Sequence, residues 1–495
     1  MLMLINLKSM EDMAKKIKIT SSKNKEVQFR QQSNVALQLL VQTQKQGATS
    51  LNEMLSYPLT PVPFSLGNPD GSLAKTDKAK GMTFVLKHFE QDPVAHDDNT
   101  RTLFIEDGNA LFYMFRSVPD TFDDISESIF GKMNPNSDVL FSTDMYSKVS
   151  IKSSERKRRG TGTRKIISGG RTKKPTEWSS FLKNEENKEQ LVAFLKKTWA
   201  TDRYAPRLLN RKVVLICEGE AFMFKSNDGT HTQTEQIEPL TSTQEETDTR
   251  VVLYCVWAKD QGYTTVRVRS PDSDIFFILV HHSNLFGAMT VLFDTGVGKH
   301  RRIINLTAFA EAHDKTFRTA LLGIHAFCGC DTTSAFKGKG HSGPIKALQK
   351  RTRFASTMEK LGTSWEVTAE LTKELEKFVC IMYGQPSYHS VDELRHLKII
   401  ASCDSGPANA IKNVNLATIP PCKRCLEIHI RRVNYQVAIW KHAHITKPAI
   451  PTPSEEHGWI IEDGEVQPLW LKGDDFVPPA TTDVLVDSIV SEEAH

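Results

Sequence analysis

The sequence predicts an α/β protein built on a mostly parallel sheet flanked by helices, and two observations support this prediction. Short apolar runs rich in β-branched residues recur from Thr102 onward, and each stops at an acidic residue. Such runs are typical of buried parallel strands, which deliver the next residue to the carboxyl edge of a sheet. The runs alternate with segments of helical periodicity at 187–199, 245–262 and 306–323. This alternation favours a sheet covered by helices.

Composition sets broad limits on the class of protein. A chain of 495 residues has room for several domains, at about 100–200 residues each. The 63 basic and 59 acidic residues leave a net charge of +4, which carries no global signature of a nucleic-acid partner. Eight thinly spread cysteines fit a reducing compartment. The apolar stretches fall far below the roughly 18 residues of a membrane span, so we expect a soluble protein with no membrane partner.

The chain divides by composition into four regions. Residues 1–95 form an N-terminal region of unclear fold, Lys-rich at first and then punctuated by proline. Residues 96–350 carry the apolar runs and form the α/β domain, with a basic loop insertion at 152–176. We expect a helical region at 351–450, followed by a Pro-rich, largely irregular tail at 451–495.

Acidic residues at the ends of the apolar runs are the candidate site. There are seven of them: Asp107, Glu218, Glu246, Asp248, Asp272, Asp274 and Asp331. Two pairs have i, i+2 spacing, which in an extended segment places both side chains on one face. Carboxylates so close together are costly unless cations join them, and oxygen ligands suit Mg²⁺. Two such ions about 4 Å apart can activate a water and absorb charge during phosphodiester hydrolysis.

The ordered set resembles the flap-endonuclease/XPG branch of the PIN-like nucleases. FIEDGNALFYMF matches its strand ending in an acid, VLICEGE its strand-Asp-Gly element, and EETDT its E-x-E helix start. SPDSD matches its D-x-D strand, GCD its G-x-D element, and GKGHSGPIKALQK its helix-two-turn-helix. The whole chain is also similar to a transposon-associated group of animal proteins, on elements such as HAFCGCDTTSAFKGKG.

The resemblance implies a nuclease that hydrolyses phosphodiester bonds of flap-like DNA or RNA with two Mg²⁺ or Mn²⁺ ions. Asp107, Glu218, Glu246 and Asp248 would hold one ion, and Asp272, Asp274 and Asp331 the other. Nucleic acid is the expected partner, DNA before RNA. The residues expected to contact it are Tyr113, Arg156, Lys157, Arg158, Arg159, Gly338, Lys339, Gly340 and Lys346. The basic run also suggests a nuclear protein.

Two alternatives remain open. Flap nucleases carry a long basic arch after their second acid, but the short stretch from Glu218 to Glu246 holds only Lys225 and His231 as basic residues. This departure favours a catalytically inactive PIN-like module that binds nucleic acid or protein. Separately, Cys422 and Cys425 have a C-x₂-C spacing that could begin a zinc site, with His429, His442 or His444 as further ligands.

Overall fold

The computed structural model describes residues 36, 40, 50–91, 100–147, 149–158, 160–401, 415–471 and 477–478. The chain forms two compact units. Unit 1 contains Met1–Phe84, Gly323–Ala438 and Pro453–His495, and unit 2 contains Val85–Leu322 and Ile439–Thr452. Residues 323–350, which the sequence analysis grouped with the sheet, therefore belong to unit 1. None of the described helices is long and apolar enough to cross a bilayer.

Unit 2 is built on an eight-stranded sheet with the order β5-β4-β3-β2-β1-β6-β7-β8. The five central strands run parallel, whereas β4, β5 and β8 pair antiparallel at the two edges. The α/β class with a mostly parallel sheet is therefore confirmed. The strands are β1 (Thr102–Asp107), β2 (Asp138–Ser142), β3 (Val213–Cys217), β4 (Glu220–Lys225), β5 (Gln233–Gln236), β6 (Thr265–Arg269), β7 (Thr290–Thr295) and β8 (Arg302–Asn305).

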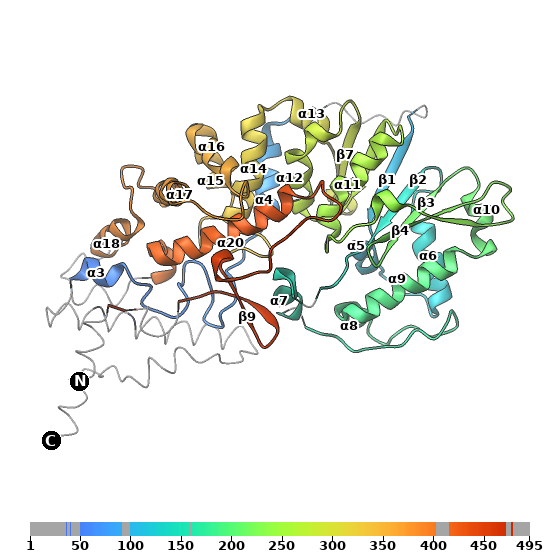
Figure 1. The fold of residues 1–495 in the computed structure, drawn as a ribbon, viewed down its shortest axis with the longest axis horizontal. Coiled ribbons are helices and arrows are strands. Elements are labelled where there is room, and N and C mark those ends of the chain that lie inside the picture. The colour runs from blue at the N-terminus through green and yellow to red at the C-terminus, as the bar shows by residue number, and fades with distance from the viewer. Residues whose placement is uncertain are drawn as a thin grey trace, which may run out of the picture. The chain divides into compact units, whose positions relative to one another are not determined.

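Helices flank this sheet, with α9 against β3 and α6, and α11 against β1 and β6 (Figure 1). The helices of unit 2 are α5 (Gly108–Tyr113), α6 (Phe122–Lys132), α7 (Ile151–Arg158), α8 (Trp178–Lys183), α9 (Glu185–Trp199), α10 (Ala205–Leu208), α11 (Thr247–Asp260), α12 (Ser273–His281) and α13 (Leu306–Glu311). Short 3₁₀ turns join them: η1 (Leu86–His88), η2 (Asp202–Tyr204), η3 (Glu238–Leu240), η4 (Ser283–Leu285) and η5 (Gly298–His300).

Strand register divides one face of the sheet into an apolar and an ionic half. Over β1 to β4, alternate residues such as Phe104 and Phe141 pack into a core cluster that includes Trp199 of α9. Over β6 to β8 the same face carries charge, because Asp294 of β7 accepts from Arg267 at 2.8 Å and Arg301 at 2.6 Å. Helices α6 and α9 contribute to the apolar half, which anchors them beside the strands that end at the site.

Three local expectations were wrong. The helix expected at 306–323 is two helices, α13 and α14 (Lys315–Cys328), because Asp314 accepts the amide of Phe317 at 2.9 Å and starts a new helix. HAFCGCD is the end of α14 rather than a strand-like run. The basic insertion begins as helix α7, and the coil after it is held by α9, where Asn187 accepts the amide of Lys165 at 2.8 Å.

Unit 1 is mainly helical. Its helices are α3 (Leu51–Leu55), α15 (Ser342–Lys350), α16 (Arg353–Lys360), α17 (Ala369–Met382) and α18 (Val391–Ala401), with α4 (Ala79–Val85), α14 and α20 (Lys423–Lys441) spanning the division in sequence, and turns η7 (Leu416–Thr418) and η8 (Glu455–His457). A two-stranded hairpin, β9 (Trp459–Glu462) with β10 (Glu465–Pro468), lies within the segment expected to be largely irregular. The buried Arg432 donates to the carbonyls of Gly458 and Leu469 and so ties this hairpin to α20.

Replacing Trp199 by alanine should destabilise unit 2. This side chain is fully buried, lies 5.3 Å from Phe130 and 5.7 Å from Phe141 between ring centroids, and donates its indole N–H to Ser126. We expect a loss of about 3–5 kcal/mol in the free energy of unfolding, measured by urea denaturation. Ile166→Ala is the control, since Ile166 is 69% exposed. A Trp199→Ala protein as stable as this control would contradict the core described above.

Candidate metal centre

Asp107 ends β1 and begins α5. Its carboxylate caps that helix by accepting the amide of Ala110 at 2.9 Å, and its second oxygen accepts from the hydroxyl of Ser270 at 2.9 Å. Ser270 directly follows β6, the parallel neighbour of β1. The carboxyl ends of β1 and β6 are therefore joined through an acidic side chain.

Both i, i+2 acid pairs lie at helix starts, as the helical segment 245–262 predicted for Glu246 and Asp248, whereas Asp272 and Asp274 were expected on a strand. Asp272 is the N-cap of α12 and accepts the amide of Asp274 at 2.8 Å. Glu246 occupies the N-cap position of α11, and Asp248 lies in its first turn. Acids are favoured at these positions because the exposed amides of a helix N-terminus carry partial positive charge. The four acids therefore lie at the N-termini of α11 and α12.

Three of the predicted acids form a compact oxygen cluster. Asp248, Asp272 and Asp274 each offer one carboxylate oxygen, and these oxygens lie within 4.8 Å of one another. Asp274 is buried, and the other two side chains are partly exposed. The N-termini of α11 and α12 thus place three oxygen ligands around one point.

Asp144 is an acid of this site that the sequence analysis missed. It follows β2, the other parallel neighbour of β1, and accepts the amide of Thr247 at 2.8 Å at the start of α11. Burial is the main cause that raises the pKa of Asp107 and Glu246, and the charge of Asp144 adds to both shifts. The run DVLFSTD shows the same pattern of a strand followed by an acid, and this signal could have identified it.

Glu218 ends a different strand. In the sheet order, β2 separates β3 from β1, and neighbouring strands are about 4.8 Å apart. Glu218 has a positive φ of 53° and is exposed, and it lines a cavity of about 270 Å³ together with Asp144, Glu189 and Glu245. Its charge raises the pKa of Glu189 and Cys217. Glu218 and Asp144 thus share this cavity.

Burial and crowding favour the protonated forms of these acids. Desolvation, reinforced by Asp144 and Asp272, raises the pKa of Asp107 to about 7. Desolvation also raises the pKa of Glu246 to about 7, although Lys152 opposes the shift. For Asp248 the pKa lies well above its usual value, because burial is followed by repulsion from Asp272 and Glu246. Such a site is unfavourable when fully ionised, and a divalent cation would remove that penalty.

The donor set fits a hard divalent cation. Each group of the cluster is a carboxylate, and Mg²⁺ takes oxygen ligands from one or two carboxylates while it keeps several waters. Mn²⁺ accepts the same ligands. The structure therefore supports a divalent-metal site of unspecified ion, in which Asp248, Asp272 and Asp274 would be the ligands.

Basic side chains of α7 and α9 border the acids. The ammonium of Lys152 lies 2.6 Å from Glu246, and Arg156 pairs with Glu185 at 2.5 Å and Glu245 at 2.6 Å. Arg156 and Lys188 also flank the ring of Tyr146, at 5.4 and 4.4 Å from its centroid. Because α7 follows Asp144 in the chain, the basic segment comes directly after an acid of the site.

Asp331 lies in unit 1, where its carboxylate is 3.3 Å from the ammonium of Lys78. The glycines at 338 and 340, also in unit 1, have φ of 75° and 54° in the turn before α15, and a Cβ at either would meet nothing within 4 Å. Between them, Lys339 places its ammonium 4.1 Å from the centroid of the Tyr383 ring. Lys346 is exposed on α15. These four residues stay predicted contacts for nucleic acid.

The other residues expected to contact nucleic acid lie on α5 and α7. Tyr113 is 55% exposed, and its hydroxyl donates to the carbonyl of Leu182 at 3.3 Å. Lys157 is exposed, whereas Arg158 pairs with Glu155 of its own helix at 2.8 Å. Arg159 lies outside the described residues. An exposed aromatic ring therefore ends the helix that Asp107 caps.

The Cys422–Cys425 pair lies buried at the start of α20, with both cysteines as free thiols. The Cys425 thiol donates to Cys422 and lowers the pKa of that thiol. His429 bonds instead to the carbonyl of Phe327 at 3.1 Å. Across the part of the chain that the structure describes, the acid cluster is the one group of three or more side chains that could hold a metal. The predicted zinc site gains no support from these residues.

Comparison with known proteins identifies no family. No protein-family model matches the sequence, and neither does any curated protein. Among solved structures, the chain is similar to a crystal structure of the T5 D15 protein co-crystallized with metal ions, with 13% identity and a TM-score of 0.30. That match covers 69% of this chain and 97% of the other. A likeness at this level assigns no function, so the case rests on the acidic residues themselves.

The metal-free protein should become less stable as pH rises from about 4 to 7. In the folded protein, the pKa of Asp107 and of Glu246 is raised to about 7, from the ordinary values of 3.8 and 4.5. Protonation of these two carboxyls therefore stabilises the folded state, and this stabilisation has its full size below the ordinary pKa values. It is then lost as pH rises through about 7. Thermal unfolding in EDTA, recorded from pH 5 to 8, measures this slope. A rising Tm over this range would contradict it.

Mn²⁺ should stabilise the protein most at pH 8, where the carboxylates are ionised. At a free concentration of about 100 Kd, the gain is about 2.7 kcal/mol, seen as a higher Tm. Asp248→Asn should abolish this gain. Asp260→Asn is the matched control, since Asp260 is an exposed acid at the other end of α11. An equal Mn²⁺ response in both variants would rule out Asp248 as a ligand.

Proposed function

We propose that this chain is a divalent-metal-dependent nuclease that hydrolyses phosphodiester bonds of DNA or RNA at structured or single-stranded ends. The observation that carries the proposal is the convergence of Asp248, Asp272 and Asp274 within 4.8 Å. Asp107 accepts from Ser270, whose hydroxyl in turn accepts the amide of Asp272, and Glu246 acts on Asp248 through its charge. The charge of Asp144 acts on Asp107. No ordinary structural role requires so many mutually repelling carboxylates at one edge of a sheet.

Two cations held in this set would supply an activated water and absorb negative charge on the leaving oxygen. We assign one ion to Asp248, Asp272 and Asp274, and the second to the side bordered by Asp107, Asp144 and Glu246. The resemblance groups Asp331 with Asp272 and Asp274, and this role of Asp331 stays a prediction. Mg²⁺ and Mn²⁺ both suit these oxygen ligands.

Basic residues beside the acids would bind the phosphate. Lys152 pairs with Glu246 and Arg156 with Glu245, so both offset carboxylate charge. Lys188 lies over the ring of Tyr146. A phosphodiester that approaches an acidic site needs such cations to reduce repulsion. With Asp144 as an acid of the site, α7 provides basic residues in the chain order that flap nucleases use for their arch. This order supports catalysis over the inactive alternative.

Asp144→Asn and Glu218→Gln form a matched pair that tests the acid set. We expect Asp144→Asn to slow Mn²⁺-dependent cleavage roughly 10- to 100-fold or more. Loss of a residue that bonds to a metal ligand typically has an effect of this size. Glu218→Gln should stay within a few-fold of the parent chain. Single-turnover cleavage of a labelled 5′-flap DNA measures both rates. The reverse pattern would place Glu218 in the site and Asp144 outside it.

A substrate panel separates the nuclease from an inactive binding module. Flap, single-stranded and stem-loop forms of DNA and RNA are incubated with the parent chain and Mn²⁺, with Asp272→Asn/Asp274→Asn as the inactive control. Cleavage by the parent chain alone is the expected result. If Mn²⁺ raises the Tm of the parent chain but every substrate survives, the protein binds metal without being a nuclease.

A further inference from the structure

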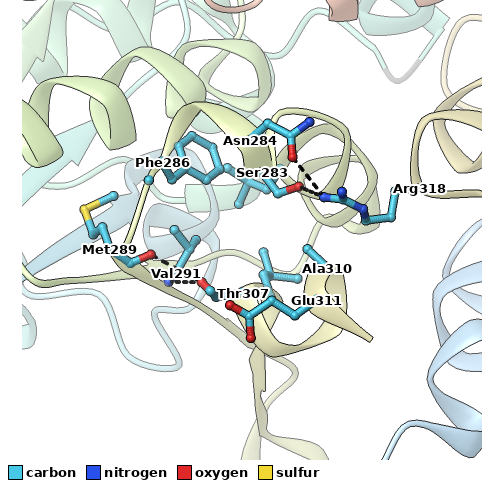
Figure 2. Close-up of a pocket in the computed structure, with 12 residues that line it drawn as sticks. Ser283, Asn284, Phe286, Met289, Val291, Thr307, Ala310, Glu311 and Arg318 are labelled. Carbon is cyan, nitrogen blue, oxygen red and sulfur yellow. Dashed lines mark hydrogen bonds between the residues drawn. The ribbon is translucent and has the colours of Figure 1, made fainter. Parts of the chain in front are cut away.

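A second cavity of about 300 Å³ lies in unit 2, away from the acids (Figure 2). It is formed by the end of α12, η4, the start of β7, α13 and the first turn of α14. Val291 lines it near the first residue of β7, whereas the acids follow the carboxyl ends of parallel strands. The cavity therefore belongs to the opposite edge of the sheet.

The floor of this cavity is apolar and buried. Six side chains form it: Leu279, Phe286, Met289, Val291, Leu306 and Ala310. Thr307 also lines it, but its hydroxyl accepts the amide of Val291 at 2.9 Å and donates to the carbonyl of Met289 at 3.3 Å. An apolar group of a ligand can therefore pack against this floor. The hydroxyl of Thr307 is already bonded to the backbone. The volume lies at the small end of the range for ligand sites.

Arg318 forms the cationic side of the cavity. As Figure 2 shows, its guanidinium reaches Ser283 and Asn284, donating from Nη1 to Ser283 Oγ at 2.5 Å and to Asn284 Oδ1 at 3.3 Å. Its Nε is shielded from solvent and has no hydrogen-bond partner. Among the described residues no carboxylate lies within 4.0 Å of this guanidinium. Because Nη1 already bonds to Ser283 and Asn284 and Nε is shielded, Nη2 is the nitrogen through which this guanidinium can bind the carboxylate of a ligand.

Glu311 forms the anionic side. It ends α13, is exposed, and makes no ion pair within the described part of the chain. The cavity thus presents one positive and one negative side chain around an apolar floor. A ligand that complements all three features carries a carboxylate, an ammonium and an apolar group.

We propose that this cavity binds a free α-amino acid with an apolar side chain of about the size of leucine. The ligand carboxylate pairs with Arg318, supported by Ser283 and Asn284. Its ammonium pairs with Glu311, and its side chain packs on Phe286, Met289 and Leu306. The proposal is independent of the metal centre, since none of these residues belongs to the acid set.

Isothermal titration of the full chain with L-leucine tests the proposal. Two analogues separate the contributions of the charged groups: 4-methylpentanoate lacks the ammonium, and 3-methylbutylamine lacks the carboxylate. We expect L-leucine to bind and each analogue to bind at least tenfold more weakly. Equal binding of 4-methylpentanoate would overturn the role of Glu311, and no heat of binding with L-leucine at millimolar concentration would overturn the site.

Variants locate the binding within the cavity. Arg318→Gln and Glu311→Gln should each weaken L-leucine binding at least tenfold, whereas Lys315→Gln, an exposed change on the same helix as Arg318, should leave it unchanged. Circular dichroism and thermal unfolding show whether each variant is folded. Ala310→Met, which fills the cavity without altering charge, serves if Arg318→Gln unfolds, and it should also abolish binding. Unchanged affinity in a folded Arg318→Gln or Ala310→Met protein would place L-leucine elsewhere.

Discussion

Repulsion among carboxylates at one edge of the sheet is the constraint on which the rest of unit 2 depends. Strands β2, β1 and β6 are parallel neighbours, so their carboxyl ends meet and bring Asp107, Asp144 and Asp272 to the same edge. Burial and mutual repulsion raise the pKa of Asp107 and Glu246 to about 7. A fold that keeps such groups together needs both a rigid frame and a source of positive charge.

Helix N-termini provide part of that charge and most of the positioning. Asp107 caps α5, Asp272 caps α12, and Asp144 accepts an amide at the start of α11. Each of these acids therefore has a backbone donor that orients it whether or not a cation is bound. Behind them, the buried Ser142 hydroxyl bonds to both Thr247 and Tyr254 at 2.9 Å and holds α11 to β2. The carboxylates of Asp248, Asp272 and Asp274 still repel one another, and a divalent ion bound between them would relieve this repulsion.

The acid cluster and the second cavity lie at opposite edges of the sheet and present different side chains. At the carboxyl edge, acidic side chains offer oxygen ligands to a divalent cation, and basic residues of α7 lie beside them. At the amino edge, an apolar floor with Arg318 and Glu311 suits a small zwitterion. Helix α12 connects them, since Asp272 and Asp274 start it and Leu279 near its end lines the second cavity.

The sequence by itself determined the α/β class and the alternation of strands and helices, because hydrophobic periodicity is a local signal. It also predicted Asp248, Asp272 and Asp274, the three acids whose carboxylate oxygens converge in the structure. It did not determine which strands are neighbours. Glu218 and Asp144 both follow strands, and only the order β3-β2-β1-β6 put Asp144 beside Asp107. Similarly, Asp272 and Asp274 lie at the start of a helix, although the sequence matched them to a strand. Strand order depends on non-local pairing, so the tertiary structure alone decided which carboxylates share the site.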